Sequence, residues 1–394
     1  MAHARVPHHS LGGTPPVRNR LRALSPLVAI AAAATLSLAT VAVTSAAGAS
    51  QHRHSHHSFL GSLDDPSLIG STVPSVGDQN PYGIATVPQS IGDLVRGDTI
   101  VSNFNAKANF QGTGTTIVEL SPSGSLTVFA NLNGTLPGAC PGGVGLTTAL
   151  AILPHGFVVV GSLPVTNGGM GSPEAGCLIV LNSQGQAVET WSGGPINGPW
   201  DLTSQSFGDF TQLFVTNVLN GPVNSTTPTS DGTVVRLGVS TEGHHVPELV
   251  SERVIATGFD EQLNSTALVI GPTGVALGWD GTLYVADTLN NRIASIPNAL
   301  FRHTAFPGGG TMVSEGGGLN SPLGLMTAPN GNVVAANGGD ANAVEVSPDG
   351  TQVDVAQLDP LGNPGDLFGL TLTPSGRGIL FVDDGDNTLR LLDR

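Results

Sequence analysis

Short apolar runs separated by glycine-, asparagine- and proline-rich turns recur along most of the chain. The clearest example is residues 272–293, which read PTGVALGWDGTLYVADTLNNRI. The runs GVAL and TLYVAD are joined by the turn GWDG, and an Asn-rich turn then leads into a third run, RIASI. Two hairpins within so short a segment predict a small antiparallel β-unit.

Five further segments repeat this pattern, each with an opening apolar run, a second run that ends in small or polar residues, and one or two more strands. They begin at Pro81, Pro141, Pro199, Pro322 and Asp366. Turns such as SPSG at 121–124 and SPDG at 347–350 separate the last two strands. Because one such unit cannot bury its own faces, the repetition predicts an architecture of stacked units.

The segment at 272–293 resembles an NHL repeat, one blade of a β-propeller. The resemblance covers residues 63–394 and implies an all-β, six-bladed β-propeller with four-stranded antiparallel blades. The sixth unit ends after its third strand, at Arg394, and an open strand edge invites aggregation. The strand-like segment from Ser67 to Val73 is expected to supply the missing strand and close the ring.

The first 62 residues differ in composition from the repeats. Residues 1–49 combine several arginines with an apolar stretch, Leu24 to Val43, and an A-x-A pattern at 47–49, which is typical of an export signal peptide. A retained membrane anchor is the alternative, because the stretch is long enough to span a bilayer. Residues 50–62 are predicted to be a His-rich flexible linker. The mature protein is expected to be extracytoplasmic, either periplasmic or secreted, and membrane-bound only if the signal is retained.

The chain is acidic, with 29 Asp and Glu residues, 14 Lys and Arg residues and a net charge of −15. Removal of residues 1–49 would make it more acidic, since they carry arginines and no Asp or Glu. Such a surface repels phosphate backbones and argues against nucleic acid as a partner. The expected partner is a protein, a glycan or a small apolar ligand.

The chain contains two cysteines, Cys140 and Cys177. In an oxidising compartment a disulfide between them is expected. It would join the loop that enters the second unit to the third strand of that unit. Two free buried thiols are the alternative.

Propellers similar to this one include metal-dependent lactonases of the gluconolactonase and paraoxonase type. These enzymes place Asn, Asp or Glu near the starts of the inner strands to coordinate a calcium-like ion, which requires several oxygen ligands. The corresponding residues here are Tyr82, Gly142, Trp200, Thr273, Leu323 and Phe368. Asp201 is the one carboxylate nearby, so the sequence argues against a lactonase site. The zinc of a peptidyl-hydroxyglycine lyase is not predicted either, because no histidine lies at a blade start.

A set of Asn and Asp residues recurs at the end of the second strand of five units: Asn103, Asn217, Asp287, Asn337 and Asp383. Repetition in so many units favours a role in shaping the following turn over a role as metal ligands.

Two other segments are candidates for metal binding. Asp383, Asp384 and Asp386 form an acidic run that is a candidate for calcium, although it lacks the alternation of an EF-hand loop. His52, His54, His56 and His57 are candidates for zinc, copper or nickel, with a solvated linker as the alternative. No cofactor is predicted beyond calcium or zinc at such segments.

The sequence thus predicts an exported, non-catalytic propeller that acts as a binding or scaffold module through its channel mouth or loops. Tyr82, Trp200 and Phe368 occupy equivalent positions and, with Asp201, are candidate ligand-binding residues at that mouth. Packing between blades is the alternative role for the three aromatic residues. The alternative function is a metal-dependent, lactonase- or lyase-like enzyme that uses an ion held by Asp201 and the recurring Asn and Asp residues.

Overall fold

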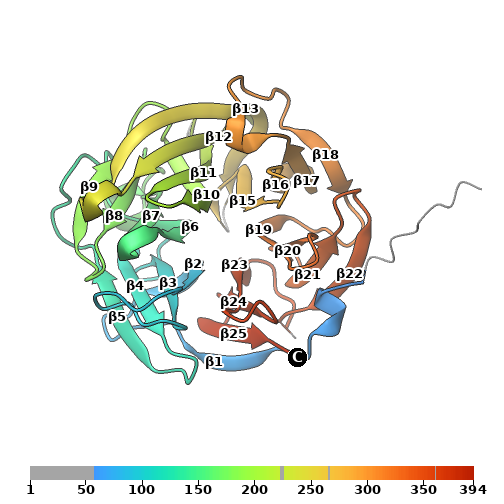
Figure 1. The fold of residues 1–394 in the computed structure, drawn as a ribbon, viewed down its shortest axis with the longest axis horizontal. Coiled ribbons are helices and arrows are strands. Elements are labelled where there is room, and N and C mark those ends of the chain that lie inside the picture. Colours follow the sequence, from blue (N-terminus) through green and yellow to red (C-terminus); the bar gives the residue numbers. More distant parts are fainter. Residues whose placement is uncertain (1–56, 222–225, 265–266, 360) are drawn as a thin grey trace, which may run out of the picture. The chain divides into compact units, whose positions relative to one another are not determined.

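The computed structural model describes residues 57–221, 226–264, 267–359 and 361–394. The expected signal peptide and His52, His54 and His56 lie outside the described residues. Within those residues the chain forms six antiparallel sheets, arranged as blades around a central axis (Figure 1). The six-bladed β-propeller predicted from the repeats is therefore confirmed.

Blades 1 to 5 are each built from consecutive strands, with the first strand innermost. Blade 1 contains β2 (Gln79–Thr86), β3 (Thr99–Asn105), β4 (Thr116–Leu120) and β5 (Leu126–Asn131). Blade 2 contains β6 (Leu146–Ile152), β7 (Val158–Ser162), β8 (Cys177–Leu181) and β9 (Ala187–Trp191). Blade 3 contains β10 (Gly198–Phe207), β11 (Phe210–Val218), β12 (Thr229–Ser240), β13 (Glu248–Asn264) and the short β14 (Leu268–Ile270).

Blade 4 contains β15 (Pro272–Leu277), β16 (Leu283–Asp287), β17 (Arg292–Ile296) and β18 (Thr311–Glu315). Blade 5 contains β19 (Pro322–Thr327), β20 (Val333–Asn337), β21 (Asn342–Val346) and β22 (Gln352–Gln357). Blade 6 joins β23 (Leu367–Leu372), β24 (Ile379–Asp383) and β25 (Thr388–Leu392) to β1 (Ser67–Ser71). The described helices are short: η1 (Leu60–Ser62), η2 (Pro154–Gly156), α1 (Thr166–Gly169), η3 (Glu242–His244), η4 (Thr288–Asn290) and η5 (Ala299–Phe301).

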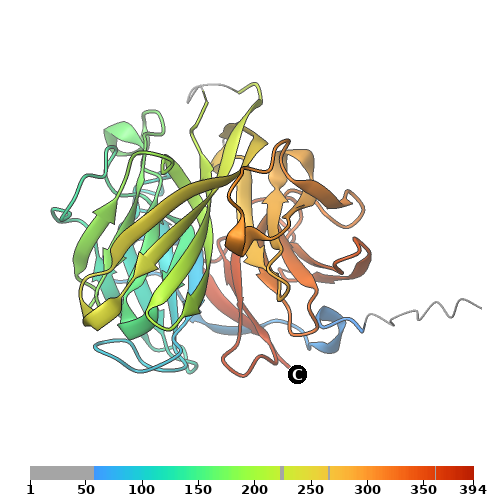
Figure 2. The same cartoon turned by 45° about the horizontal axis from the view of Figure 1, so that its top comes forward.

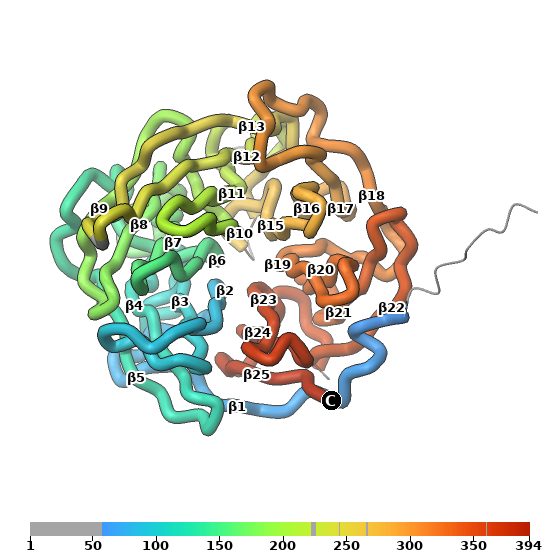
Figure 3. Tube along the Cα trace, in the orientation of Figure 1, coloured from blue at the N-terminus to red at the C-terminus, as the bar shows by residue number. Residues whose placement is uncertain are grey.

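The ring is closed by β1, which pairs antiparallel with β25. Ser67 lies opposite Leu391, and Ser71 lies opposite Thr388. In Figure 3 the blue N-terminal strand runs beside the red strands of the last blade. The predicted closing strand therefore covers the edge that the last third strand would otherwise expose.

The hydrophobic core lies between neighbouring blades. Every residue of β7, β16 and β20 is buried, because a blade in the ring is covered on both faces by its neighbours. This explains why these strands read as continuous apolar runs and do not alternate with polar residues.

The second blade begins later than the sequence pattern suggested. Gly142 was expected at the start of its inner strand, but β6 begins at Leu146 and Gly142 lies in the preceding loop. The bulge of β6 is also longer. Three residues separate its paired residues Leu146 and Leu150, whereas two residues lie between the corresponding pairs of β10 and β15. The Pro-Gly-Gly segment resembles the opening motif of the repeat, and for this reason the start of the inner strand was predicted too early.

Blade 3 departs from four strands. Its β12 and β13 are 12 and 17 residues long, and β13 runs in yellow along the outer side of the blade (Figure 2). The end of β13 then forms a hairpin with β14, in which Leu263 pairs with Val269. This added hairpin reaches the central channel and contributes to the site described next.

Candidate functional site

One end of the channel is filled by aromatic side chains. Tyr82, Trp200 and Phe368 lie in the bulges of β2, β10 and β23 and are only 2%, 3% and 1% exposed. The ring centroids of Tyr82 and Phe368 are 3.7 Å apart. The ring of Phe104 also stacks on Tyr82, with the centroids 4.4 Å apart. We call these four residues the aromatic cluster.

The β13–β14 hairpin covers the aromatic cluster. The indole Nε1 of Trp200 donates a 2.9 Å hydrogen bond to the carbonyl oxygen of Val269, and Ala267 and Ile270 belong to the same apolar core. The three aromatic residues singled out from the sequence are therefore brought together, but inside the packed channel. Ligand binding by these side chains stays a prediction.

Beyond the aromatic cluster the channel widens into a cavity of about 340 Å³, which we call the channel cavity. All six inner strands line it. Along β10 the residues change from buried at Trp200 to half-buried at Thr203 and exposed at Gln205, so the cavity opens toward the carboxyl ends of the inner strands. The hydroxyl-bearing residues of the lining are Thr86, Thr148, Thr203, Ser204, Thr327 and Thr371.

Asp201 lies at the inner end of the channel cavity, next to Trp200. It is 7% exposed and is the one ionisable residue among the described residues that line the cavity. Its Oδ1 accepts a 2.8 Å hydrogen bond from the amide of Leu202, and its Oδ2 accepts one of 3.2 Å from the amide of Val275. Burial raises the pKa of Asp201 to about 8, although these two hydrogen bonds act in the opposite direction.

Asp201 breaks the pattern of the repeat. At the equivalent position four other blades have glycine: Gly83, Gly274, Gly324 and Gly369. A Cβ atom on Gly274 would lie 2.1 Å from the carbonyl oxygen of Leu323 in the next blade, so this position normally admits no side chain. Blade 3 carries a carboxyl group here despite the cost of burying it, and a costly departure from a repeat points to a functional role.

Thr148 is a second polar group of the cavity. It is 5% exposed, and its Oγ1 is buried without a hydrogen-bond partner among the described residues. It lies on β6, the inner strand beside β10. Sequence reasoning missed Thr148 because it started blade 2 too early; the apolar run LTTALAI before the turn LPHG was the signal for the true inner strand.

The recurring Asn and Asp residues do not line the cavity. They are buried at the ends of the second strands and are bonded to neighbouring turns. The Oδ1 of Asn217 accepts a hydrogen bond from the amide of Asn197 at 3.2 Å, and Asn337 donates one to the carbonyl oxygen of Gly318 at 2.8 Å. Asp287 pairs with Arg292 at 2.7 Å. This is the turn-shaping role expected from their repetition.

The acidic run in blade 6 forms ion pairs within that blade. The Oδ2 of Asp383 lies 3.0 Å from Nε of Arg390, and Asp386 pairs with the same guanidinium. Burial, followed by the charges of Asp366 and Asp383, raises the pKa of Asp384 to about 8. In the described part of the chain no three His, Cys, Asp or Glu side chains converge as metal ligands. The fourth histidine of the tract, His57, is exposed.

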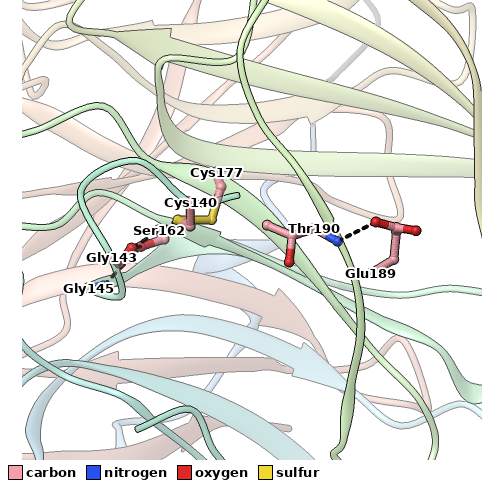
Figure 4. Close-up of a disulfide and its surroundings, with 7 residues drawn as sticks. All are labelled: Cys140, Gly143, Gly145, Ser162, Cys177, Glu189 and Thr190. Atoms are coloured by element: carbon pink, nitrogen blue, oxygen red, sulfur yellow. Dashed lines mark hydrogen bonds between the residues drawn. A yellow bond between two sulfur atoms is a disulfide. The ribbon is translucent and has the colours of Figure 1, made fainter. Parts of the chain in front are cut away.

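The disulfide between Cys140 and Cys177 is confirmed (Figure 4). Cys177 is the first residue of β8, and Cys140 lies in the loop that leads to β6, as predicted. The same loop is held by Ser162, whose Oγ donates to the carbonyl oxygen of Gly143 and accepts from the amide of Gly145, both at 2.9 Å. A disulfide indicates an oxidising, extracytoplasmic environment. Among the residues that the structure describes, no helix has the length and apolarity to cross a membrane.

Comparison with known proteins supports the fold. The family model described as "NHL repeat" matches residues 270–294, which cover blade 4 from its start to its third strand. No curated protein sequence matches the chain.

Solved structures resemble the chain at low sequence identity. A streptogramin B lyase is 15% identical with a TM-score of 0.50, and the match covers 84% of this chain and 98% of that one. The calcium-binding protein regucalcin from Agrobacterium tumefaciens is 14% identical with a TM-score of 0.52, over 83% and 93% of the two chains. The PQQ-bound aldose sugar dehydrogenase from Streptomyces coelicolor is 15% identical with a TM-score of 0.51, over 84% and 98%. At such identities the likeness shows a shared fold and no shared activity. The chain is a six-bladed β-propeller with an NHL repeat in its fourth blade.

Proposed function

We propose that this protein is an exported, non-catalytic binding propeller that holds a small ligand in the channel cavity. The observation that carries the proposal is Asp201, a buried carboxyl group placed where four other blades have glycine. Asp287 and Asp383 each lie beside an arginine, whereas Asp201 faces a cavity whose other described residues bear no charge. A concave site in which a carboxyl group and several hydroxyl groups converge can fix the orientation of a small ligand.

The closed inner end and the volume of the cavity support a ligand of limited size. The cavity of about 340 Å³ holds on the order of ten non-hydrogen atoms if each needs roughly the volume of a water molecule. The disulfide supports an extracytoplasmic location, periplasmic or secreted. A partner protein or a glycan chain would reach only the outer part of the cavity.

A blocking variant tests the location of the site. Ser204→Trp places a large side chain in the half-buried part of the lining, and Ser206→Trp places the same side chain on the same strand, outside the cavity. In a thermal-shift screen of small molecules, compounds that stabilise the wild type should lose their effect in Ser204→Trp and keep it in Ser206→Trp. Equal shifts in both variants would refute the channel cavity as the binding site.

A lactonase- or lyase-like enzyme is the second candidate. The observation that favours it is the pKa of Asp201, raised to about 8 by burial, because an acid–base catalyst works best with a pKa near the operating pH. Metal analysis of the purified protein, combined with lactone hydrolysis by wild type and Asp201→Asn, tests this candidate. Tightly bound stoichiometric metal and turnover that the variant abolishes would favour the enzyme over the binding protein.

A further inference from the structure

We propose that the channel cavity selects a primary amine, with its ammonium group bound by Asp201 and its apolar body against the aliphatic walls. This inference rests on the proposed function and names the chemical class of the ligand. It is carried by the charge, the free hydrogen-bonding capacity and the surface of the lining.

Charge is the first argument. The residues that line the cavity from β2, β6, β15, β19 and β23 are apolar, glycine or hydroxyl-bearing, so no described group of these strands faces Asp201 with a charge. An ionised carboxylate therefore has no partner of opposite charge in the site, and an isolated buried charge is costly. A ligand cation supplies that partner, while an anion would add repulsion. The net charge of −15 also raises the local concentration of cations near the protein.

Hydrogen-bonding capacity is the second argument. Each oxygen of Asp201 accepts one backbone hydrogen bond, from Leu202 or Val275, and a carboxylate oxygen can accept a second. Thr148 contributes an unsatisfied buried hydroxyl from the neighbouring strand. An ammonium group has three N–H donors, which suits a carboxylate and a hydroxyl oxygen lining the same cavity.

The walls are the third argument. Leu150, Val275, Leu325 and Leu370 line the cavity from four different blades, beside its hydroxyl-bearing residues and its one acid. An amine with a compact hydrocarbon body can pair its ammonium group with Asp201 and pack its carbon atoms against these aliphatic side chains.

Binding is coupled to a proton. Because burial raises the pKa of Asp201 to about 8, the free protein carries this carboxyl group mainly protonated at pH 7. The ammonium ion binds the carboxylate, so the acid Asp201–COOH and R–NH₃⁺ give the pair Asp201–COO⁻ and R–NH₃⁺ plus one proton released to solvent. Charge and atoms balance, and the released proton is measurable.

Three near-isosteric probes test the proposal by isothermal titration calorimetry with the full chain: cyclohexylmethylamine, cyclohexylmethanol and cyclohexanecarboxylate. The amine should bind the wild type at least tenfold more tightly than the alcohol or the acid. At pH 7, titrations in buffers of different ionisation enthalpy should show release of close to one proton per amine bound.

Two substitutions and a control locate the contacts. Asp201→Asn keeps the shape of the side chain and should weaken amine binding at least tenfold and abolish proton release, while binding of the alcohol stays unchanged. Thr148→Val should weaken amine binding several-fold. Asp209→Asn, which alters an acid in the β10–β11 turn bonded to His155 and outside the cavity lining, should have no effect.

The outcomes separate the ligand class from the site. Absence of amine binding, equal binding of amine and alcohol, or unchanged amine binding by Asp201→Asn would overturn the amine proposal. If another probe binds and Ser204→Trp blocks it, the channel cavity stands as a site and only the amine class fails. If Ser204→Trp blocks no probe that binds, the proposed function fails as well.

Discussion

The carboxylate of Glu345 in β21 accepts a 2.8 Å hydrogen bond from the backbone amide of Leu60, 285 residues earlier in the chain. The same carboxylate accepts hydrogen bonds from the amide of Phe59 at 3.1 Å and from Asn332 at 2.6 Å, and Glu345 is fully buried. The segment that precedes β1 is thus fastened to blade 5 before the chain crosses to complete blade 6. Ring closure therefore involves two blades.

Loss of this carboxylate should destabilise the propeller. Glu345→Gln exchanges one acceptor oxygen for an NH₂ group among N–H donors, and disruption of a buried charged hydrogen-bond network costs about 2–4 kcal/mol. Urea unfolding should show this loss, whereas Glu315→Gln, on the exposed end of β18, should change the unfolding free energy by less than about 0.5 kcal/mol. Equal effects of the two substitutions would contradict the proposed fastening.

The same site predicts a response to acid. Burial acts to raise the pKa of Glu345, but the hydrogen bonds from Asn330, Leu60 and Phe59 outweigh it and hold the pKa below its usual value. The stabilising contribution of Glu345 is therefore present above the pKa of an unfolded glutamate and is lost as the pH falls through the folded-state pKa. Unfolding midpoints from pH 5 down to pH 2 should drop less steeply in Glu345→Gln than in the wild type.

Asp201 predicts the opposite trend at higher pH. Its folded-state pKa of about 8 lies above the unfolded value, so the native state binds this proton more tightly and loses stability as the pH rises through the window between about 4 and 8. Burial also raises the pKa of Asp384 to about 8, which acts in the same direction. Asp201→Asn should be less stable than the wild type at pH 4, because its NH₂ group cannot accept one of the two backbone hydrogen bonds, and should gain a few kcal/mol relative to the wild type between pH 4 and pH 8. Urea titrations at the two pH values check this, and an equal difference at both would show that Asp201 does not titrate in this window.

Removal of the closing strand should expose the edge of β25. A chain without residues 63–76 loses the pairing of Ser67 with Leu391 and of Ser71 with Thr388. Because unpaired strand edges recruit other chains, the shortened protein is expected in the insoluble fraction after expression. A soluble product with the unfolding midpoint of the wild type would rule out a closing role for β1.

The disulfide should contribute measurable stability. Cys140 and Cys177 are separated by 37 residues, and a bridge closing a loop of this size is worth about 2–4 kcal/mol. Unfolding in the presence of a reductant should show a loss of this size for the wild type. The double variant Cys140→Ala/Cys177→Ala should start from the lower value and show no further change on reduction.

Local patterns were sufficient to predict the number of blades, the closing strand and the disulfide, but they misplaced the inner strand of blade 2. Strand and turn signals repeat within each blade, and the strand-like segment at 67–73 lay outside the six units, the last of which lacked a fourth strand. The burial of Trp200 was not predictable in this way, because it depends on the β13–β14 hairpin, an addition to blade 3 with no counterpart in the repeat. The contact between Leu60 and Glu345 joins distant segments through backbone amides, which carry no sequence signal at all.

The aromatic cluster and the hairpin that covers it also determine how molecules exchange with the cavity. Since Trp200 and its neighbours fill one end of the channel, the described residues leave the cavity open to water and solutes between the carboxyl ends of the inner strands. An occupant that enters there leaves by the path along which it arrived. Anything that settles over that opening would slow uptake and release by the same factor, lengthening the residence time of a molecule already inside while leaving its equilibrium affinity unaltered.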